Sequence, residues 1–353
     1  MHPPIPRIGP SVQVKLSPLD LKIISILQRH GRSALSEIAK SLHVSVPVVS
    51  YRLDRLAREN VIRGFHSHIR LLPGFRYSIF RFRSRPGRGG ELFHRLESDP
   101  RTISVFSLTG SMDIGVGMLF LPGEDREVVT DLQSKREFDS FERSEVIGFT
   151  PAELDYSRNL TPFTPRGLDR LIGKGRRRET LKEKSSIELS VADIRLLSAV
   201  SKNSRATLQS LADELGSTVS FVKGQITRLI DEGIILKFFA SINPYAIGSY
   251  FFVCAWIQLL SNEDEEDLLR GINRMQIGNG TLRLSGVWTH ALFLHFASME
   301  EFFSFEDKIR AYPSMIKYES QIVQKQGHLD WIPSHVIKIL SSNSQKSREE
   351  KTE

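Results

Sequence analysis

Hydrophobic residues near the start of the chain recur every three or four positions. The apolar residues from Leu19 to Leu27 would share one face of a helix running from Pro18 to Arg29. Ser17 precedes this run, and Asp20 lies three residues after Ser17, which is the spacing of a capping box. The pattern therefore predicts an amphipathic helix with a defined start.

Two further helices follow at short intervals. One spans about Leu35 to Leu42, and the other begins after Ser45 and ends near Glu59, with a tight turn at His43-Val44 between them. Three short helices with a serine before the third are the layout of a helix-turn-helix, whose third helix reads DNA. The alternating stretch from Val61 to Leu71 then predicts a strand, which we expect to form the wing.

The same pattern returns later in the chain. The segment LSPLDLKIISILQRHGRSALSEIAKSLHVS, from Leu16, aligns without gaps on LSVADIRLLSAVSKNSRATLQSLADELGST, from Leu189, at an offset of 173 residues. The segments ENVIRGFHSHI and EGIILKFFASI match at the same offset. A period kept over this length indicates duplication of one structural unit.

Each helix-turn-helix is followed by the same predicted order of strand, helix, strand, strand, helix and strand. The first copy places these elements at 77–83, 90–97, 103–109, 114–120, 124–138 and 141–149. The second copy places them at 250–260, 263–274, 281–284, 291–296, 299–311 and 316–324. This split βαβ order gives an antiparallel sheet with both helices on one face. The predicted fold class is α+β, a tandem duplication of a winged helix-turn-helix followed by a ferredoxin-like βαββαβ sandwich.

These units divide the chain into six predicted segments. They are a winged helix-turn-helix at 12–72, a sandwich at 75–160, a basic linker at 161–187, a second winged helix-turn-helix at 188–245, a second sandwich at 248–335 and a polar tail at 338–353. Two interpretations of the linker stay open, an extended solvated connection or a strap that touches DNA phosphates. The composition of the tail predicts disorder.

The composition limits which partners the protein can have and in which cell compartment it is expected. A net charge of +7 and a pI near 9.5 favour a polyanionic partner such as double-stranded DNA. The one cysteine, Cys254, excludes a disulfide framework and a CxxC metal site. The longest apolar stretch, 247–260, is too short to span a bilayer as a helix, and the proline-rich start lacks the apolar core of a secretory signal. We therefore expect a cytoplasmic protein with no membrane partner and no cofactor.

The third helix of each copy supplies the candidate DNA contacts. In the first copy they are Ser45, Pro47, Ser50, Tyr51, Arg52 and Arg55. In the second copy they are Thr218, Ser220, Lys223, Gln225, Thr227 and Arg228. We assign base contacts to Ser50 and Arg52, because arginine can bond guanine bidentately, and phosphate contacts to Tyr51 and Arg55. The competing interpretation is that these side chains form only the solvated face of an amphipathic helix.

Four motifs carry a family resemblance. They are LSEIAKSLHVS, then RLDRL at 52–56, then NVIRGFHSHI, and finally TGSMD at 109–113. In this order and spacing they resemble the Lrp/AsnC family of prokaryotic transcription regulators, over about 16–160 and 189–335. The resemblance implies a winged helix that reads DNA and a sandwich (RAM-type) that dimerises. In many members the sandwich also binds an amino acid or another small effector near the glycine-to-aspartate turn.

By this resemblance Gly110, Met112 and Asp113 become effector-binding candidates, while the alternative is that Asp113 only caps its turn. Family members are usually half this length, so the resemblance implies that one chain equals a family dimer, an intramolecular pseudo-dimer that could assemble further into a homo-oligomer. The second copy has Thr289 in place of Asp113 and Gln225 in place of the family's first arginine. Whether the second half binds DNA therefore stays open, and any cognate site should be an imperfect palindrome.

An enzyme is the alternative class. Some relatives of this fold are tetrapyrrole (sirohaem) decarboxylases, but their histidine-cysteine-tyrosine segment is missing where this chain reads RTISVFSLTG and GTLRLSG. No catalytic residue is predicted. His66, His68, His290 and His295 lack carboxylate or cysteine partners at ligand spacing, so no metal site is predicted either. The sequence thus predicts a DNA-binding transcription regulator that is not an enzyme.

Overall fold

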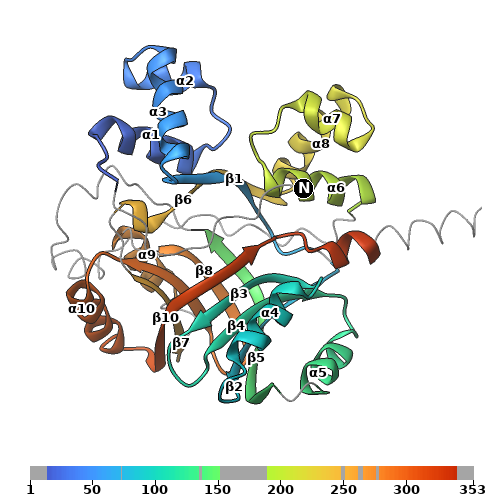
Figure 1. Cartoon of the computed structure of the whole chain (residues 1–353), viewed down its shortest axis with the longest axis vertical. Coiled ribbons are helices and arrows are strands. Elements are labelled where there is room, and N and C mark those ends of the chain that lie inside the picture. The colour runs from blue at the N-terminus through green and yellow to red at the C-terminus, as the bar shows by residue number, and fades with distance from the viewer. Residues whose placement is uncertain are drawn as a thin grey trace, which may run out of the picture.

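Two bundles of three helices lie above a single rounded body of strands (Figure 1). The computed structural model describes residues 14–72, 74–134, 137–151, 189–247, 251–260, 265–275 and 278–339. The predicted basic linker and most of the predicted polar tail lie outside these ranges. No helix among the described residues combines the length and the apolar character needed to cross a bilayer.

The first bundle contains α1 (Pro18–Arg29), α2 (Leu35–Leu42) and α3 (Val46–Arg58). α1 begins where the capping box predicts, because the Asp20 carboxylate accepts from the Ser17 amide at 2.7 Å and the Ser17 hydroxyl accepts from the Asp20 amide. Buried aliphatic side chains from all three helices then form one small core.

The second bundle repeats the first. It contains α6 (Val191–Lys202), α7 (Leu208–Leu215) and α8 (Val219–Asp231). Ser190 and Asp193 form the same capping box at its start. The predicted repeat of the helix-turn-helix is therefore confirmed, helix by helix.

A two-stranded ribbon joins the two copies. It consists of β1 (Ile62–Ile69) and β6 (Ile235–Ile242), which pair antiparallel. The strand predicted after α3 is confirmed, but its partner differs from the expectation of a wing within each unit, since each strand pairs with the other copy. One face of the ribbon rests on the strands below, where the ring of His68 lies against those of Phe149 and Trp331.

Reciprocal contacts fix the two helical bundles to this ribbon. The Gly31 amide donates to the Phe238 carbonyl at 2.8 Å, and the Ser204 amide donates to the Phe65 carbonyl at the same distance. A Cβ atom on Gly31 would lie 2.6 Å from the Phe239 nitrogen, so a larger residue at this position would require the backbone to shift. The two copies thus meet through matching positions, as in a twofold-symmetric interface.

Matching arginines extend the same interface. Arg32 donates to the carbonyls of Ser204 and Ala206, and Arg205 donates to those of Gly31 and Ser33. Arg32 also lies over the ring of Phe238, and Arg205 over the ring of Phe65. Each bundle is therefore held by an arginine from the other.

Below the bundles, the strands of both halves close into one barrel. The first half supplies β2 (Arg76–Ser84), β3 (Thr102–Leu108), β4 (Ile114–Phe120) and β5 (Phe138–Pro151). The second half supplies β7 (Phe251–Leu259), β8 (Gly278–Ser285), β9 (His290–Phe296) and β10 (Met315–Leu329). The order around the barrel is β10-β3-β4-β2-β5-β8-β9-β7. Each half therefore has the predicted ferredoxin-like strand order, and the edges of the two sheets pair with each other, which leaves no open edge.

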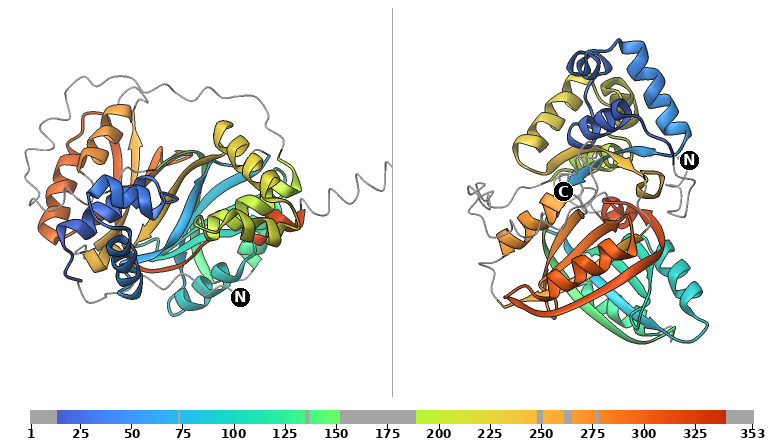
Figure 2. Two further views of the ribbon diagram at one scale, coloured as in Figure 1. Left: turned by 90° about the horizontal axis from the view of Figure 1, so that it is seen from above. Right: turned by 90° about the vertical axis from the view of Figure 1, so that its left-hand side faces the viewer.

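Helices cover the outside of the barrel (Figure 2). They are α4 (Gly89–Ser98), α5 (Asp125–Ser134), α9 (Glu265–Met275) and α10 (Met299–Arg310), while a short turn of 3₁₀ helix, Pro244–Ile247, follows β6. Phe138, predicted as the last residue of the helix before this strand, is the first residue of β5 instead. Phe138 begins β5 because its ring packs against those of Phe82 and Phe141.

Candidate nucleic-acid interface

The turn between the second and third helices sets how α3 and α8 are presented. His43 ends α2 in the left-handed conformation, with φ of 55°, and Gly216 ends α7 with φ of 60°. Ser45 and Thr218 then occupy the N-cap positions, although only the Thr218 hydroxyl accepts a capping hydrogen bond, from the Phe221 amide. The same backbone path in both copies gives α3 and α8 equivalent placements on their bundles.

Burial separates the two faces of α3. Val49 and Leu56 are fully buried, whereas Pro47, Tyr51, Asp54 and Arg58 form an exposed stripe along the opposite face. Of the predicted DNA contacts in this copy, Ser45, Pro47 and Tyr51 are exposed and Ser50 is half-buried. Tyr51 stands out, with 64% of its surface exposed.

Arg52 and Arg55 are brought together by a residue of α1. Arg52 donates to Asp20 Oδ1 at 2.9 Å and to the Ser17 hydroxyl at 2.8 Å, and Arg55 donates to Asp20 Oδ2 at 2.8 Å. The Asp20 side chain is completely buried, while each arginine remains about a quarter exposed. The predicted base contact of Arg52 therefore stays a prediction, and the structure gives this guanidinium a role between α1 and α3.

The charge state of Asp20 follows from these partners. Burial alone would raise the pKa of the Asp20 carboxyl, but the hydrogen bonds from Ser17 and Arg52 and the charge of Arg55 outweigh it and leave the pKa below its usual value. The carboxylate therefore stays ionised near neutral pH and keeps both arginines in place.

The equivalent network in the second copy contains one arginine instead of two. Arg228 donates to Asp193 and to Glu232, and its Nε donates to the Gln225 side chain at 3.0 Å. Gln225 stands where the first copy has Arg52, so Asp193 receives one arginine instead of two. Gln225 and Arg228 are thus both engaged within the bundle, as are Arg52 and Arg55 in the other.

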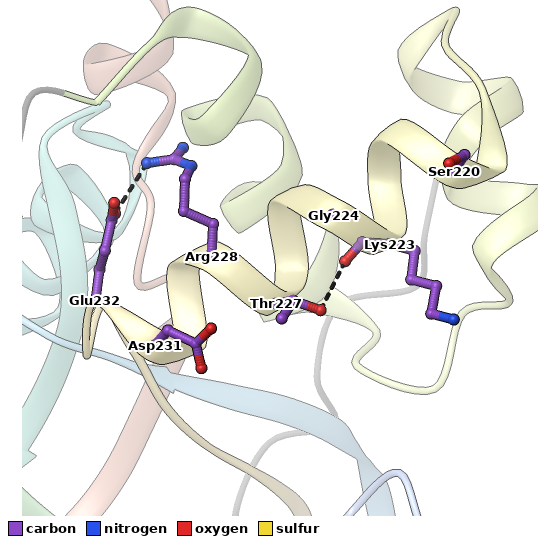
Figure 3. A pocket seen from close by; sticks show the side chains of 7 residues that line it. All are labelled: Ser220, Lys223, Gly224, Thr227, Arg228, Asp231 and Glu232. Carbon is purple, nitrogen blue, oxygen red and sulfur yellow. Dashed lines mark hydrogen bonds and ion pairs between the residues drawn. The ribbon is translucent and has the colours of Figure 1, made fainter.

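The outer face of α8 is open. Thr218, Ser220, Lys223 and Thr227 are exposed, and Gly224 lies between them with nothing within 4 Å of the position a Cβ would take. This face forms a shallow groove of about 640 Å³ that also reaches Arg228, Asp231 and Glu232 (Figure 3). Gly224 occupies the position of Tyr51 in the first copy, so a partner can approach the backbone of α8 where it would meet a large ring on α3.

Five exposed apolar side chains on these helices were missed in the sequence analysis. They are Val46 and Val48 in the first turn of α3, Val219 and Phe221 in the first turn of α8, and Ile230 near the end of α8. The inward positions Val49 and Val222 follow directly, so the helical period would have placed their apolar neighbours outside the core.

The turn predicted to bind an effector is occupied by contacts within the chain. The Asp113 carboxylate accepts from the Ser84 amide at 2.7 Å and from the Ser84 hydroxyl. The Gln321 side chain donates to the carbonyls of Thr109 and Met112, beside Gly110. In the second half, the Thr289 hydroxyl accepts from the Leu259 amide in the same way that Asp113 accepts from Ser84.

A buried arginine lies where the two sheets meet, and the sequence patterns did not reveal it. Arg81 on β2 is almost completely buried and donates to Glu142 at 3.2 Å and to Glu319 of the other half. Its guanidinium lies over the rings of Trp256 and Trp288, 4.6 and 5.4 Å from their centroids. Arg81 alternates with Phe80 and Phe82 and so shares one face of β2 with Tyr77 and Ile79, which could have signalled a side chain directed into the barrel.

The histidines of the ribbon are packed among aromatic rings. His68 is buried against Phe239, and burial together with the charge of Lys237 lowers the pKa of His68 to about 3, so its ring is neutral. Within the part of the chain that the structure describes, no group of three or more His, Cys, Asp or Glu side chains is placed to hold a metal ion.

Comparisons with known proteins address the two helical bundles first. A family model described as winged helix-turn-helix DNA-binding matches residues 16–63 and 189–235. An uncharacterized HTH-type transcriptional regulator of Pyrococcus abyssi is 32% identical over 113 residues, which are 31% of this chain and 70% of that protein. The HTH-type transcriptional regulator AldR of Mycobacterium tuberculosis is 36% identical over 75 residues, which are 21% of this chain and 42% of that protein.

A solved structure resembles most of the chain in fold. The siroheme decarboxylase NirDL superposes with a TM-score of 0.61 and covers 93% of this chain and 100% of its own. The two sequences are 12% identical, so this likeness shows the fold alone.

Proposed function

This chain belongs to the family of HTH-type transcriptional regulators that its Lrp/AsnC resemblance predicted, and on that premise we propose that α3 and α8 enter the major groove of duplex DNA. The protein then acts in the cytoplasm as a sequence-specific transcription regulator. The observation that carries the proposal is the repeated turn and third helix, each with a buried stripe and an exposed opposite face.

The contacts within the bundles divide the predicted DNA-binding residues into two groups. Exposed side chains without a side-chain partner in the described contacts, such as Tyr51, Ser220 and Lys223, are the direct contacts in this proposal. Arg52, Arg55 and Arg228 orient the third helices through Asp20 and Asp193, and in this proposal their partly exposed guanidinium groups also serve phosphate contact.

Selection of duplexes from a random-sequence library by the full chain tests the proposal. The selected duplex should bind far more tightly than a scrambled one, and the affinity should fall as salt rises. Tyr51→Ala and Lys223→Ala should each weaken binding by about tenfold, because each contact contributes on the order of 1 kcal/mol or more. Arg126→Ala, an exposed cation on α5 below the bundles, is the matched control and should leave the affinity unchanged.

Regulation by a small effector is the second part of the proposal. An amino acid bound at Gly110, Met112 and Asp113 would place its amine on Asp113 in exchange for Ser84. A thermal-shift screen of the amino acids should find a stabilising ligand whose effect is lost in Asp113→Ala. A shift that survives this substitution assigns the ligand to another site.

The second candidate function is an enzyme of the sirohaem decarboxylase type. The full-length likeness in fold favours it, and the low identity and the regulator relatives favour the first candidate. Incubation of the chain with sirohaem, followed by measurement of released carbon dioxide, separates the two. Turnover of sirohaem with no selected duplex would replace the regulator by the enzyme.

A further inference from the structure

Six of the eleven exposed large hydrophobic side chains among the described residues lie on the two third helices. They are Val46, Val48 and Tyr51 on α3 and Val219, Phe221 and Ile230 on α8, each at least 37% exposed. Four of these six stand in the first helical turn, beside the N-cap, where the helices of this motif meet the edges of bases. Apolar side chains gathered in the same turn of two equivalent helices suit a contact with a partner.

The charge around these turns indicates an anionic partner. The first turns of α3 and α8 contain no acidic residue, whereas those of α1 and α6 contain Asp20 and Asp193. The positive end of the helix dipole is therefore left uncovered on α3 and α8. Lys223 adds a positive charge one turn further along α8.

The chemistry of the major groove supplies a match for an apolar surface. Thymine is the base that presents a methyl group there, and it is read by apolar side chains. We infer that the apolar first turns of α3 and α8 recognise thymine methyl groups, one set in each half of the bound site. This inference rests on the proposed function and specifies what the two helices read.

The two half-sites are read by different side chains. Phe221 stands where the first copy has Val48, and Gly224 stands where it has Tyr51. Both helices begin with an exposed valine, Val46 or Val219. On α8 this valine is accompanied by one large ring and an open backbone, while on α3 it is accompanied by a second valine and a tyrosine. The thymines recognised by the two helices should lie at different positions of an imperfect palindrome.

The test uses deoxyuridine, which pairs like thymidine but lacks the methyl group. A duplex selected by the full chain is prepared with each thymine replaced singly by uracil, and the dissociation constant is measured by fluorescence anisotropy. Replacement of a recognised thymine should weaken binding about fourfold, the effect of one buried methyl group.

Two variants assign these thymines to helices. Val48→Ala should abolish the uracil effect in one half-site and leave it in the other, and Phe221→Ala should do the reverse. Both residues are exposed, so neither change removes core packing. Phe303→Ala, an exposed ring on α10, is the control and should leave every uracil effect intact.

The outcomes separate the inference from the function on which it depends. If a selected duplex binds tightly but tolerates uracil everywhere, or if the uracil effects persist in both variants, the methyl contacts are overturned and the regulator remains. A change of oligomeric state in the variants without any uracil effect would assign the apolar surface to protein contact instead. If no duplex is selected at all, the proposed function fails and the inference fails with it.

Discussion

Asp20 and Asp193 determine how rigidly each third helix is held on its bundle. Asp20 accepts from two arginines of α3, and Asp193 accepts from one arginine of α8, since Gln225 replaces the other. A buried carboxylate that receives charged hydrogen bonds stabilises its neighbours only while all partners stay together. The two copies therefore differ in stability as well as in the surface they present.

Removal of these carboxylates should reveal the difference. Asp20→Ala leaves Arg52 and Arg55 without their acceptor and should lower the free energy of unfolding by about 3 kcal/mol. Asp193→Ala removes one acceptor from Arg228 alone and should lower the free energy of unfolding by about 2 kcal/mol. Urea denaturation of both variants checks the order, and equal losses would contradict the account of the two networks.

The same network makes stability depend on pH. Because the pKa of Asp20 is lower in the folded chain than in the unfolded one, its contribution is complete above the unfolded value of about 4. The contribution should be lost as the pH falls through the lower, folded pKa. Asp20→Asn should therefore flatten the loss of stability below pH 4, which thermal unfolding across this range measures. An unchanged pH profile in Asp20→Asn would exclude the Asp20 carboxyl as its source.

The sequence predicted only part of this network. The capping box of Ser17 and Asp20 could be read directly, because its residues are three positions apart. The arginines that bind Asp20 lie 32 and 35 positions away, and they reach it only because α3 crosses the start of α1. Helical periodicity placed Arg52 and Arg55 outside the core, but it could not predict that the buried Asp20 carboxylate lies beside them.

At the scale of elements, the pairing of β1 with β6 decides how the two bundles are spaced. Arg32 and Arg205 lock this pairing from both sides, each with two hydrogen bonds to carbonyl groups of the other bundle. Two DNA-reading units held at a fixed spacing bind a matched pair of half-sites more tightly than either unit alone. The ribbon is therefore the element that couples α3 to α8.

Weakening this interface should reduce the gain in affinity that two half-sites give over one. Arg32→Ala removes two hydrogen bonds and the contact with Phe238, and should weaken binding to the two-half-site duplex about tenfold. Binding to a duplex with a single half-site should change little. Arg29→Ala is the control, since the exposed Arg29 side chain donates to the Ser25 carbonyl of its own helix. If Arg32→Ala weakened both duplexes equally, the coupling role of the ribbon would be wrong.

The periodicity of the sequence identified every strand named above but not its partner. Alternation of apolar and polar residues fixes which face of a strand is buried, and it leaves open which neighbour the strand pairs with. In a duplicated chain each strand has two equivalent choices, its own copy or the other. β1 pairs with β6 of the other copy, and β3 and β5 each pair with the other copy along one edge while they keep β4 and β2 of their own copy along the other edge. No local pattern predicts these pairings.

At the scale of the whole molecule, the two halves pair within one chain and close a single barrel around a shared core. Arg81 of the first half bridges Glu142 of its own half and Glu319 of the other. The sequence indicated this pairing through the length of the chain and its repeat. The asymmetric centre, with arginine on one side and Trp256 and Trp288 on the other, could not be predicted because it depends on the register across two sheets.

Replacement of Arg81 tests whether this centre holds the halves together. Arg81→Met leaves two carboxylates facing each other without a cation and should cost about 3 kcal/mol of unfolding free energy. Arg81→Lys keeps the charge but loses the two-sided geometry, so it should cost less. Urea denaturation followed by tryptophan fluorescence reports on both variants, and an Arg81→Met chain as stable as the original would show that the barrel does not rely on this bridge.

A fluorescence-anisotropy titration tests whether both third helices of one chain read one duplex. The full chain is titrated with its selected duplex over a range of salt concentrations. We expect one chain per duplex, a dissociation constant of roughly 10⁻⁸ M or tighter near physiological salt, and a steady loss of affinity as salt rises. No binding at low ionic strength, or equal affinity for selected and scrambled duplexes, would contradict it.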